Sequence, residues 1–293
     1  MSIRLLALDL DGTLLDPRGK VSARNRQALA DARQCDVRVA LCTGRRFRDA
    51  RPLALDLGLD VPLISHNGAL TKHAETLETV SVLLLPLAAA QIAVRVGQSY
   101  GADALVSDDH EGLGVLVYDH LSGDNPSLLR YIKWARRVHG EEGARSIVEV
   151  PSLANYLDHE PVHIAFSGGC AAVSDLAKVL AAELGSAAKL LTTMYPQMDF
   201  ALLDVIHPQA SKGVGVAAAA AELGLVSEEV MAIGDNFNDL EMLEFAGTPI
   251  VMANAGAALR ERQDFHATAS NAEDGVALAI EKFILEVQQP TTT

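Results

Sequence analysis

Two aspartates stand two residues apart directly after the first apolar run of the chain. The run covers residues 3–8, and Asp9 and Asp11 follow it in the sequence Asp-Leu-Asp-Gly-Thr. On a strand both side chains point the same way, and their repulsion needs a cation or a shared proton to relieve it. Gly12 permits a tight turn, and Thr13 offers a hydroxyl and an amide where an anion can sit. The pattern favours chemistry at a strand end over an ordinary turn rich in Asp and Gly.

A second polar segment, Thr43-Gly44-Arg45, follows the apolar run of residues 37–42. A hydroxyl and free amides at this position can hold a phosphoryl oxygen, and the N-terminus of a following helix adds its dipole. Arg45 is either a partner for a substrate anion or a surface cation on that helix. The segment alone does not decide between these two roles.

The third segment is rich in oxygen ligands and follows the strand-like run of residues 230–233. It reads Gly234-Asp235-Asn236-Phe237-Asn238-Asp239. Carboxylates at a strand end suit Mg²⁺, which takes one or two of them together with waters and a phosphate oxygen. A calcium loop would need longer acidic spacing and a distal Glu. Helix capping by Asn238 or Asp239 is compatible with metal binding but does not need so many carboxylates.

Lys212 is placed at the start of a predicted helix, after Ser211. A cation is unfavourable at the positive end of the helix dipole, so its position is explained if it neutralises an anion. That anion would be a phosphate together with an Asp carboxylate. The glycines Gly213 and Gly215 imitate a dinucleotide-binding pattern, but they do not directly follow a strand, which argues against nucleotide binding there.

The elements around these segments predict a parallel sheet. Strands are expected at residues 3–10, 37–42 and 62–65, and helices at 23–34, capped by Ser22, and 47–57. This alternation implies right-handed crossovers, and reactive groups of such a sheet gather beyond the carboxyl ends of its strands. Asp9, Thr43 and Asn67 each follow a predicted strand. We therefore expect all three at one edge of the sheet.

The pattern changes between residues 84 and 205, which predict a separate α+β domain with a partly antiparallel sheet. Helices are expected at residues 87–100, 127–138 and 171–184, and strands at 104–107, 114–118, 147–150, 162–166, 190–194 and 200–205. Alternation then resumes with a helix at 212–223, strand 230–233, helix 238–245, strand 249–252 and a last helix at 275–287, before a frayed end at 290–293. Residues 1–83 and 206–293 are thus predicted to form a doubly wound, mostly parallel α/β core around an inserted domain of residues 84–205.

Composition limits the class of protein. The chain has 293 residues and a formal net charge of −14, which argues against broad binding to nucleic acid or to an anionic membrane surface. No stretch approaches the ~20 apolar residues that span a bilayer, and residues 1–8 are too short for a signal peptide. Three cysteines are too few and too scattered for a disulfide framework or a zinc site. We expect a soluble cytoplasmic protein.

Together the polar segments resemble the haloacid dehalogenase superfamily of phosphatases and phosphomutases. Its four motifs are matched in order by Asp9-Leu10-Asp11-Gly12-Thr13, Thr43-Gly44-Arg45, Lys212 and Gly234-Asp235-x-x-Asn238-Asp239. The large insertion between the second and third motifs resembles the Cof-like subfamily with its α/β cap, as do Asn67-Gly68-Ala69, Ser211-Lys212-Gly213 and Asn254-Ala255. The resemblance implies a Rossmann-like catalytic core, with the inserted cap setting substrate specificity.

The resemblance also implies roles for the site residues. Asp9 is the nucleophile that forms an aspartyl-phosphate, and Asp11 is the general acid and base, protonated at the start because carboxylates crowd around it. Mg²⁺ is held by Asp9, the backbone carbonyl of Asp11 and Asp235. Asp239 belongs to the same metal set, either as a ligand or by orienting the metal's surroundings and Lys212.

The remaining residues implied by the resemblance contact the substrate. Thr43, Gly44 and Lys212 hold the phosphoryl oxygens as charge spreads over them. The substrate-binding set comprises Gly12, Gly44, Arg45, Asn67 and Asn238. The implied substrate is a small phosphorylated metabolite, of which phosphorylated sugars are the family expectation, and the sequence does not indicate an oligomeric state.

Two other functions remain open at this stage. A phosphomutase of the phosphomannomutase type has both aspartates and a similar cap, and differs in how well it holds a bisphosphate against water. A sugar-phosphate-binding regulator without turnover should have lost one of Asp9, Asp11, Lys212 or Asp235, and none is missing. A superfamily ion pump would have Lys in place of Asp11. A metal-dependent phosphatase is the function that the sequence favours.

Overall fold

The chain forms two compact units in the structure, a computed structural model that describes residues 2–123, 125–138 and 140–286. Unit 1 comprises Met1–Ser81 and Ser211–Thr293, and unit 2 comprises Val82–Ala210. The predicted boundaries, after residue 83 and before residue 206, lie within a few residues of this division. The assignment of catalysis to one unit and of specificity to the other stays a prediction.

Unit 1 contains an eight-stranded sheet within the described residues. In spatial order its strands are β14 (His266–Ala267), β13 (Thr248–Val251), β12 (Val230–Gly234), β1 (Leu5–Asp9), β2 (Arg38–Cys42), β3 (Pro62–Ser65), β4 (Leu70–His73) and β5 (Thr79–Val82). The strands from β14 to β3 are parallel, and β4 pairs antiparallel with β3. Every residue of β1 and β12 is buried, as expected for central parallel strands covered on both faces.

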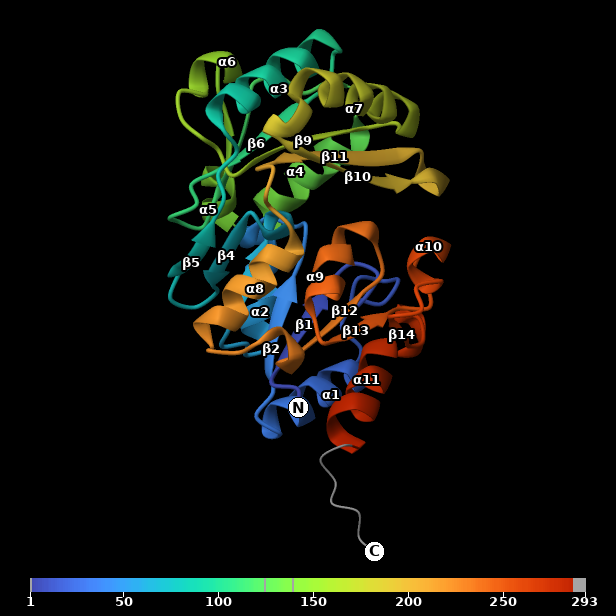
Figure 1. Ribbon diagram of the computed structural model, residues 1–293. Coiled ribbons are helices and arrows are strands. Elements are labelled where there is room, and N and C mark those ends of the chain that lie inside the picture. Colours follow the sequence, from blue (N-terminus) through green and yellow to red (C-terminus); the bar gives the residue numbers. More distant parts are fainter. Residues whose placement is uncertain (1, 124, 139, 287–293) are drawn as a thin grey trace, which may run out of the picture. The chain divides into compact units, whose positions relative to one another are not determined.

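Helices cover both faces of this sheet. They are α1 (Ala23–Gln34), α2 (Phe47–Asp56), α8 (Lys212–Glu222), α9 (Leu240–Phe245), α10 (Ala257–Arg260) and α11 (Gly275–Ile280). Ser22 caps α1 by accepting a hydrogen bond from the backbone N–H of Asn25, as predicted. Buried residues of α8 and α9 pack against Leu5 and Ala7 of β1, so α8 lies beside the N-terminal strands in Figure 1.

Unit 2 contains a six-stranded sheet within the described residues. Its spatial order is β10 (Lys189–Tyr195), β11 (Phe200–Ile206), β9 (His163–Gly168), β6 (Ala104–Asp108), β7 (Val115–Tyr118) and β8 (Ile147–Glu149). Neighbouring strands are antiparallel except for β7 and β8. The predicted α+β organisation of this region, with a partly antiparallel sheet, is confirmed.

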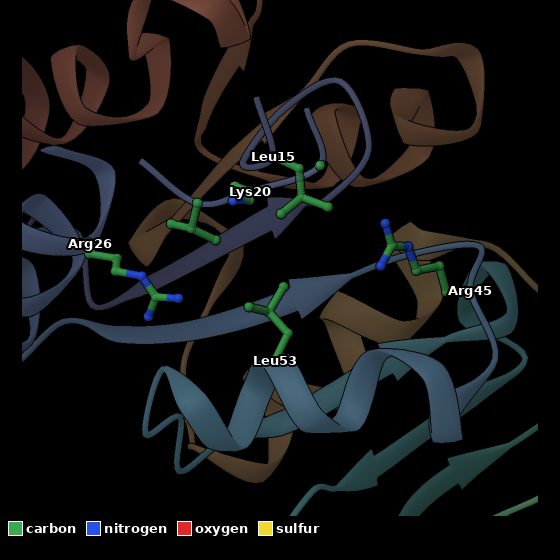
Figure 2. A pocket seen from close by; sticks show the side chains of 7 residues that line it. Leu15, Lys20, Arg26, Arg45 and Leu53 are labelled. Carbon is green, nitrogen blue, oxygen red and sulfur yellow. The ribbon is translucent and has the colours of Figure 1, made fainter. Parts of the chain in front are cut away.

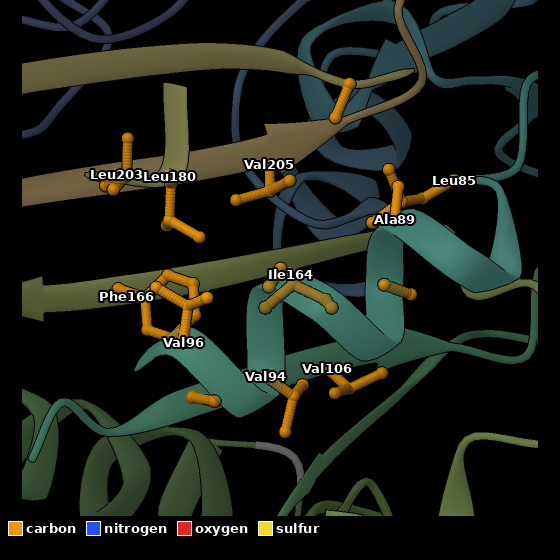
Figure 3. Packing of buried hydrophobic residues seen from close by; sticks show 14 of the residues in the cluster. Leu85, Ala89, Val94, Val96, Val106, Ile164, Phe166, Leu180, Leu203 and Val205 are labelled. Atoms are coloured by element: carbon orange, nitrogen blue, oxygen red, sulfur yellow. The ribbon is translucent and has the colours of Figure 1, made fainter. Parts of the chain in front are cut away.

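Two helices pack against one face of the unit 2 sheet. The helices of the unit are α3 (Leu87–Ser99), α4 (Pro126–Val138), α5 (Gly140–Arg145), α6 (Leu153–Tyr156) and α7 (Cys170–Leu184). Residues of α3 and α7 bury Ile164, Phe166 and Leu203 in an apolar core, and Figure 3 shows α3 lying along these strands. A second cluster packs α4 against residues of β6, β7 and β8, and those of β6 and β7 alternate with residues of the first cluster and so point to the opposite face of the sheet.

The fold class predicted from the sequence is confirmed, and the differences lie in short elements. The sequence did not predict β4, β5 and β14 of unit 1, nor the short helices α5, α6 and α10. The predicted helix at 238–245 begins with a 3₁₀ turn at Phe237–Asp239 before α9. Val287, the predicted end of the last helix, and the predicted frayed end at 290–293 lie outside the described residues. No helix in the described part of the chain is long and apolar enough to cross a bilayer.

Candidate active site

Four neighbouring parallel strands of unit 1 bring the predicted polar segments to one edge of the sheet. Asp9 ends β1 and is paired with Cys42 of β2, which is in turn paired with Ile64 of β3. On the other side of β1, Leu8 is in register with Ile233 of β12. The residues that follow these strands therefore leave the sheet at the same level. This confirms the expectation that Asp9, Thr43 and Asn67 lie on one edge.

Lys212 forms a buried ion cluster with two of the predicted carboxylates. Its Nζ donates to Oδ1 of Asp9 at 2.6 Å and to Oδ1 of Asp239 at 2.5 Å. The side chains of Lys212, Asp9 and Asp239 are 1%, 6% and 0% exposed. Asp239 also accepts hydrogen bonds at Oδ2 from the backbone N–H groups of Asp235 and Asn236. Both oxygens of Asp239 are thus engaged in holding Lys212 and the loop after β12.

Close backbone packing places Lys212 at this edge. A Cβ atom on Gly68 would lie 1.8 Å from the carbonyl oxygen of Ser211, and the φ angle of Gly68 is +87°. A Cβ atom on Gly213 would lie 2.5 Å from the carbonyl oxygen of Glu241 in α9. Only glycine allows the start of α8 to approach both segments so closely. The Ser211 hydroxyl caps α8 by accepting from the backbone N–H of Val214.

Burial and mutual repulsion perturb the acids of this cluster. Burial and the charge of Asp239 hold the pKa of Asp9 well above its usual range. Burial and the same Asp239 charge raise the pKa of Asp235 to about 6. Burial alone would lower the pKa of the Lys212 ammonium, but Asp239 and Asp9 reverse the effect and raise it. Three carboxylates therefore share one buried ammonium, which leaves an excess of negative charge that a second cation would relieve.

The donor set fits a hard divalent cation. One carboxylate oxygen from each of Asp9, Asp235 and Asp239 lies within 4.8 Å of the others. Carboxylate oxygens are the ligands that Mg²⁺ prefers. Asp239 is fully buried and accepts one hydrogen bond at Oδ1 and two at Oδ2, so Asp9 and the partly exposed Asp235 are the better placed ligands. Of the two roles predicted for Asp239, the arrangement favours orienting Lys212 and the loop.

The loop after β1 packs tightly around Asp235. Thr13, which is fully buried, donates from its hydroxyl to Oδ1 of Asp235 at 2.9 Å. A Cβ atom on Gly12 would lie 2.3 Å from Oδ2 of Asp235, and the φ angle of Gly12 is +92°. The Thr13 hydroxyl, which we expected to be offered to an anion, is thus bonded to the partly buried carboxylate of Asp235. Gly12 is required for the approach of Asp235 and has no side chain with which to contact substrate.

Asp11 points toward Arg45 rather than toward the buried carboxylates. The Arg45 guanidinium donates from Nε and Nη2 to the two carboxylate oxygens of Asp11, at 2.7 and 2.6 Å. The Asp11 side chain is 53% exposed. The expected crowding of carboxylates around Asp11 is therefore wrong, since its side-chain partner is a cation. The guanidinium thus occupies both carboxylate oxygens of Asp11 in a bidentate pair.

The segment after β2 has fewer free amides than expected. The backbone N–H of Thr43 donates to the Ile64 carbonyl at 2.8 Å, and the N–H of Arg45 donates to Oγ1 of Thr43 at 3.1 Å. The described part of the chain provides no acceptor for the N–H of Gly44. The amide of Gly44 and the hydroxyl hydrogen of Thr43 thus remain as the donors that this segment can offer to an anion.

Asn67 joins three loops at the strand ends. Its backbone N–H donates to the Thr43 carbonyl at 3.0 Å, and its Oδ1 accepts from Nδ2 of Asn238 at 2.9 Å. A Cβ atom on Gly44 would lie 3.0 Å from the same Oδ1. Asn67 has a positive φ of 54°, a conformation that costs energy and is found at functional sites. Asn67 and Asn238 therefore bond to each other and hold the loops together.

A pocket of about 330 Å³ lies next to Arg45 (Figure 2). Lys20, Arg26 and Arg45 line it together with Leu15 and Leu53. Arg26 has Asp56 as a partner at 2.6 Å, and Arg45 has Asp11. An anionic group in this pocket would have to compete with these carboxylates for the arginines. Arg45 thus lies between Asp11 and the pocket, and its predicted pairing with a substrate anion stays a prediction.

Two residues of this region were not predicted to act here. His66 is buried and accepts at Nε2 from the backbone N–H of Phe47, so that it satisfies the first N–H of α2. Asn254 donates from Nδ2 to the Gly12 carbonyl and approaches Asp235. The position of His66 directly after a strand was a usable signal. Asn254 belonged to the resemblance to the Cof-like subfamily, but nothing local indicated its contacts.

The fold and this cluster of acids and lysine define a class of enzyme. The family model for haloacid dehalogenase-like hydrolases matches residues 6–280. The chain belongs to this family and is a hydrolase of the phosphatase type, as the motifs indicated.

The similarity extends over the whole length of individual relatives. YwtE of Bacillus subtilis, a 5-amino-6-(5-phospho-D-ribitylamino)uracil phosphatase, is 30% identical over 292 residues, which cover 96% of this chain and 98% of that protein. The pyridoxal phosphate phosphatase YbhA of Escherichia coli is 29% identical and covers 94% of this chain and 97% of its own. A solved haloacid dehalogenase-like hydrolase from B. subtilis has a TM-score of 0.77 at 22% identity, covering 96% of this chain and all of that one, which supports the fold.

Proposed function

We propose that this chain is a Mg²⁺-dependent phosphatase that hydrolyses phosphomonoesters of small metabolites, sugar phosphates among them, through an aspartyl-phosphate on Asp9. The observation that carries the proposal is the buried cluster in which Lys212 contacts both Asp9 and Asp239. A buried ammonium and three carboxylates are costly in a folded protein unless a ligand or a reaction uses them. The two relatives described above are named for small phosphorylated substrates, which supports the same class here.

In the first half of the reaction Asp9 is the nucleophile. One carboxylate oxygen attacks phosphorus, the bond from phosphorus to the leaving oxygen breaks, and the proton of Asp11 passes to that oxygen. Lys212 is bonded to Oδ1 of Asp9, which leaves the other carboxylate oxygen for the attack, and it offers positive charge to the phosphoryl group. A divalent cation bound by Asp9, Asp235 and the Asp11 carbonyl would supply further positive charge, which lets two anions approach.

In the second half Asp11 is the general base. Its carboxylate takes a proton from water, the water oxygen attacks phosphorus, and the bond to Asp9 breaks to release inorganic phosphate. The amide of Gly44 and the hydroxyl of Thr43 are the donors available to the phosphoryl oxygens.

The pair of Asp11 and Arg45 adds a requirement to this sequence of steps. Both carboxylate oxygens of Asp11 accept hydrogen bonds from Arg45 in the structure, whereas the first half needs a proton on one of them. The ion pair must therefore open before the leaving group departs. We propose that an anionic part of the substrate draws Arg45 away, which gives Arg45 its predicted place in substrate binding.

The predicted assignment of catalysis to one unit and of specificity to the other is part of the proposal. Unit 1 contains every residue of the cluster and is proposed to be catalytic, and unit 2 is proposed to select the leaving group. Gly12, Asn67 and Asn238 are retained as residues that shape the site, with Asn238 bonded to Asn67.

Phosphate release from a panel of phosphomonoesters tests the proposal. The panel contains sugar phosphates, nucleotides, pyridoxal phosphate and 5-amino-6-(5-phospho-D-ribitylamino)uracil, with and without Mg²⁺. We expect Mg²⁺-dependent release by the wild-type protein and none by the Asp9→Asn variant, which preserves shape but lacks the nucleophile. Release that survives Asp9→Asn would contradict the proposal. No release at all, from folded protein with Mg²⁺ present, would favour a phosphomutase or a binding protein.

A further inference from the structure

Asn254 follows β13 and reaches across to the loop after β1. Its Nδ2 donates to the Gly12 carbonyl at 2.8 Å and lies 3.4 Å from Oδ2 of Asp235. The residue is exposed at the edge of the sheet, so its contacts are not a consequence of core packing. One amide group therefore connects the backbone beside Asp11 with the carboxylate proposed as a metal ligand.

The orientation of the Asn254 amide is fixed by a second asparagine. The backbone N–H of Asn271 donates to Oδ1 of Asn254 at 3.0 Å, which directs Nδ2 toward Gly12 and Asp235. Nδ2 of Asn271 donates to the Leu15 carbonyl at 2.8 Å. Two side-chain amides thus tie the segments after β13 and β14 to the loop after β1, across more than two hundred residues of sequence.

Asp235 has a donor at each of its carboxylate oxygens. Thr13 donates to Oδ1 at 2.9 Å, and Nδ2 of Asn254 lies beside Oδ2. Gly12 closes the third side, because no Cβ atom fits between its backbone and the carboxylate. Each carboxylate oxygen keeps a further lone pair for a cation, while its direction is set by these neighbours.

From these contacts we infer that Asn254 is a positioning residue for the divalent-cation site, which aligns the Asp235 carboxylate with the backbone of the Asp11–Gly12 turn. The inference rests on the proposed function, because it assumes that Asp235 binds a cation. Asn254 does not bond to the reacting groups Asp9 or Lys212 in the structure. We therefore expect replacement of Asn254 to weaken cation binding more than it slows the chemical step.

The test is the dissociation constant for Mg²⁺, measured by titration calorimetry on the whole chain without substrate. Asn254→Ala removes the amide, and we expect Mg²⁺ to bind about 10-fold more weakly, as is usual when a group that orients a metal ligand is lost. Asn254→Ser also removes the amide but shortens the side chain less than Asn254→Ala does. We expect a similar loss of Mg²⁺ affinity. Melting temperatures are compared with the wild type, and the variant with the smaller change in melting temperature provides the deciding value.

Asn271→Ala is the matched control. It removes the side-chain bond to Leu15 but keeps the backbone N–H that orients Asn254. We expect its Mg²⁺ dissociation constant to stay within about twofold of the wild type. A tenfold loss in both Asn254→Ala and Asn271→Ala would show a general effect of loop stability and would overturn the inference.

The remaining outcomes separate this inference from the proposed function. Unchanged Mg²⁺ affinity in Asn254→Ala and Asn254→Ser, with normal binding by the wild type, would overturn the role of Asn254 alone. If the wild-type chain bound no Mg²⁺, the proposed metal site itself would be refuted, together with the role assigned to Asn254.

Discussion

The two units of the chain differ in what they bury. At the edge of the unit 1 sheet, Lys212, Asp9 and Asp239 are almost completely removed from solvent and contact one another. Unit 2 has a polar cluster too, where Asp108 accepts hydrogen bonds from Tyr156 and His159, but the His159 side chain is 42% exposed. The core of unit 2 between α3, α7 and the sheet is apolar. Burial of charge is therefore concentrated in the unit that contains the proposed chemistry.

Under the proposed function, the unit 1 edge is the part arranged for reaction, and the apolar core of unit 2 is a part that stabilises the fold. An apolar core stabilises a fold in proportion to the area that it buries, whereas a buried ion cluster seldom stabilises more than an apolar one of the same shape. Charge at the unit 1 edge can be compared with packing or surface charge elsewhere by substitution and by a change of pH.

Replacing Lys212 should have the largest effect. In Lys212→Met, Asp9 and Asp239 remain buried without their cation, and we expect a loss of about 3–5 kcal/mol in the free energy of unfolding, together with loss of phosphatase activity. Lys178→Ala is the control, because Lys178 forms an exposed pair with Asp175 in unit 2 and should cost less than about 0.5 kcal/mol. Chemical denaturation measures both. Equal costs would refute the comparison between the units.

Overpacking the apolar core of unit 2 should affect stability without affecting the cation site. A Cβ atom on Gly97 of α3 would lie 2.2 Å from the ring of Phe166, so Gly97→Ala should destabilise by about 1–3 kcal/mol. Gly123→Ala is the control, since a Cβ atom there meets no neighbour. We expect the Mg²⁺ dissociation constant of Gly97→Ala to stay near that of the wild type. A large change in it would show that the two regions are energetically coupled.

The stability of the metal-free protein should fall as the pH rises between about 4 and 6. The folded-state pKa of Asp235 is raised to about 6, and that of Asp9 is also raised, so the folded protein binds more protons than the unfolded chain in this range. Ionisation of these carboxyls is therefore unfavourable in the fold. Unfolding temperatures in a chelator should be a few degrees higher at pH 5 than at pH 7.5.

Mg²⁺ provides the control for this pH effect. A bound cation favours the ionised carboxylates, so the decrease in stability between pH 5 and pH 7.5 should shrink when Mg²⁺ replaces the chelator. Asp235→Asn should also reduce the decrease, because it removes one of the titrating groups. The same decrease in the wild type and Asp235→Asn would show that other groups cause it.

His159 in unit 2 should give the smallest effect. Hydrogen bonds to Asp158 and Asp108 raise the pKa of His159, so its contribution to stability is complete at pH values below its unfolded pKa and is lost as the pH rises through the folded value. His159→Gln should therefore lower the unfolding temperature more at pH 5.5 than at pH 8.5. The effect should stay below about 1 kcal/mol, since the pair is partly exposed. A larger loss at pH 8.5 would contradict the assigned sign.

Most of the fold could be predicted because local patterns of apolar and polar residues indicate its strands and helices. The strands that end at Asp9, Cys42 and Ser65 are short apolar runs followed by polar residues, and Ser22 and Ser211 provide helix caps. Strands β4 and β5 were not predicted, because each has only four residues, LTKH and TVSV, in which polar residues are mixed with one or two apolar ones. Lys72 of β4 is a charged residue that is nevertheless fully buried in the fold, which no periodicity indicates.

The contacts of the site could be predicted only in part. Asp9, Thr43 and Asn67 each lie at or just after the end of a strand. Because parallel strands end at one edge of the sheet, the sequence indicated that these residues would be neighbours. Such a position did not determine side-chain direction, so the pairing of Asp11 with Arg45 was not foreseen. The approach of Asn254 to Gly12 joins residues 242 positions apart and depends on the order of strands in the sheet, which no local pattern specifies.

We propose that Asp9 accepts the phosphoryl group beside Lys212, Asp235 and Asp239. The most direct test is to stop turnover with acid and locate the phosphate by mass spectrometry, using a substrate that the panel identifies. We expect a phosphoryl group on Asp9 that requires Mg²⁺ and is absent from Asp9→Asn. Turnover without phosphate on Asp9, or with phosphate on another residue, would contradict it.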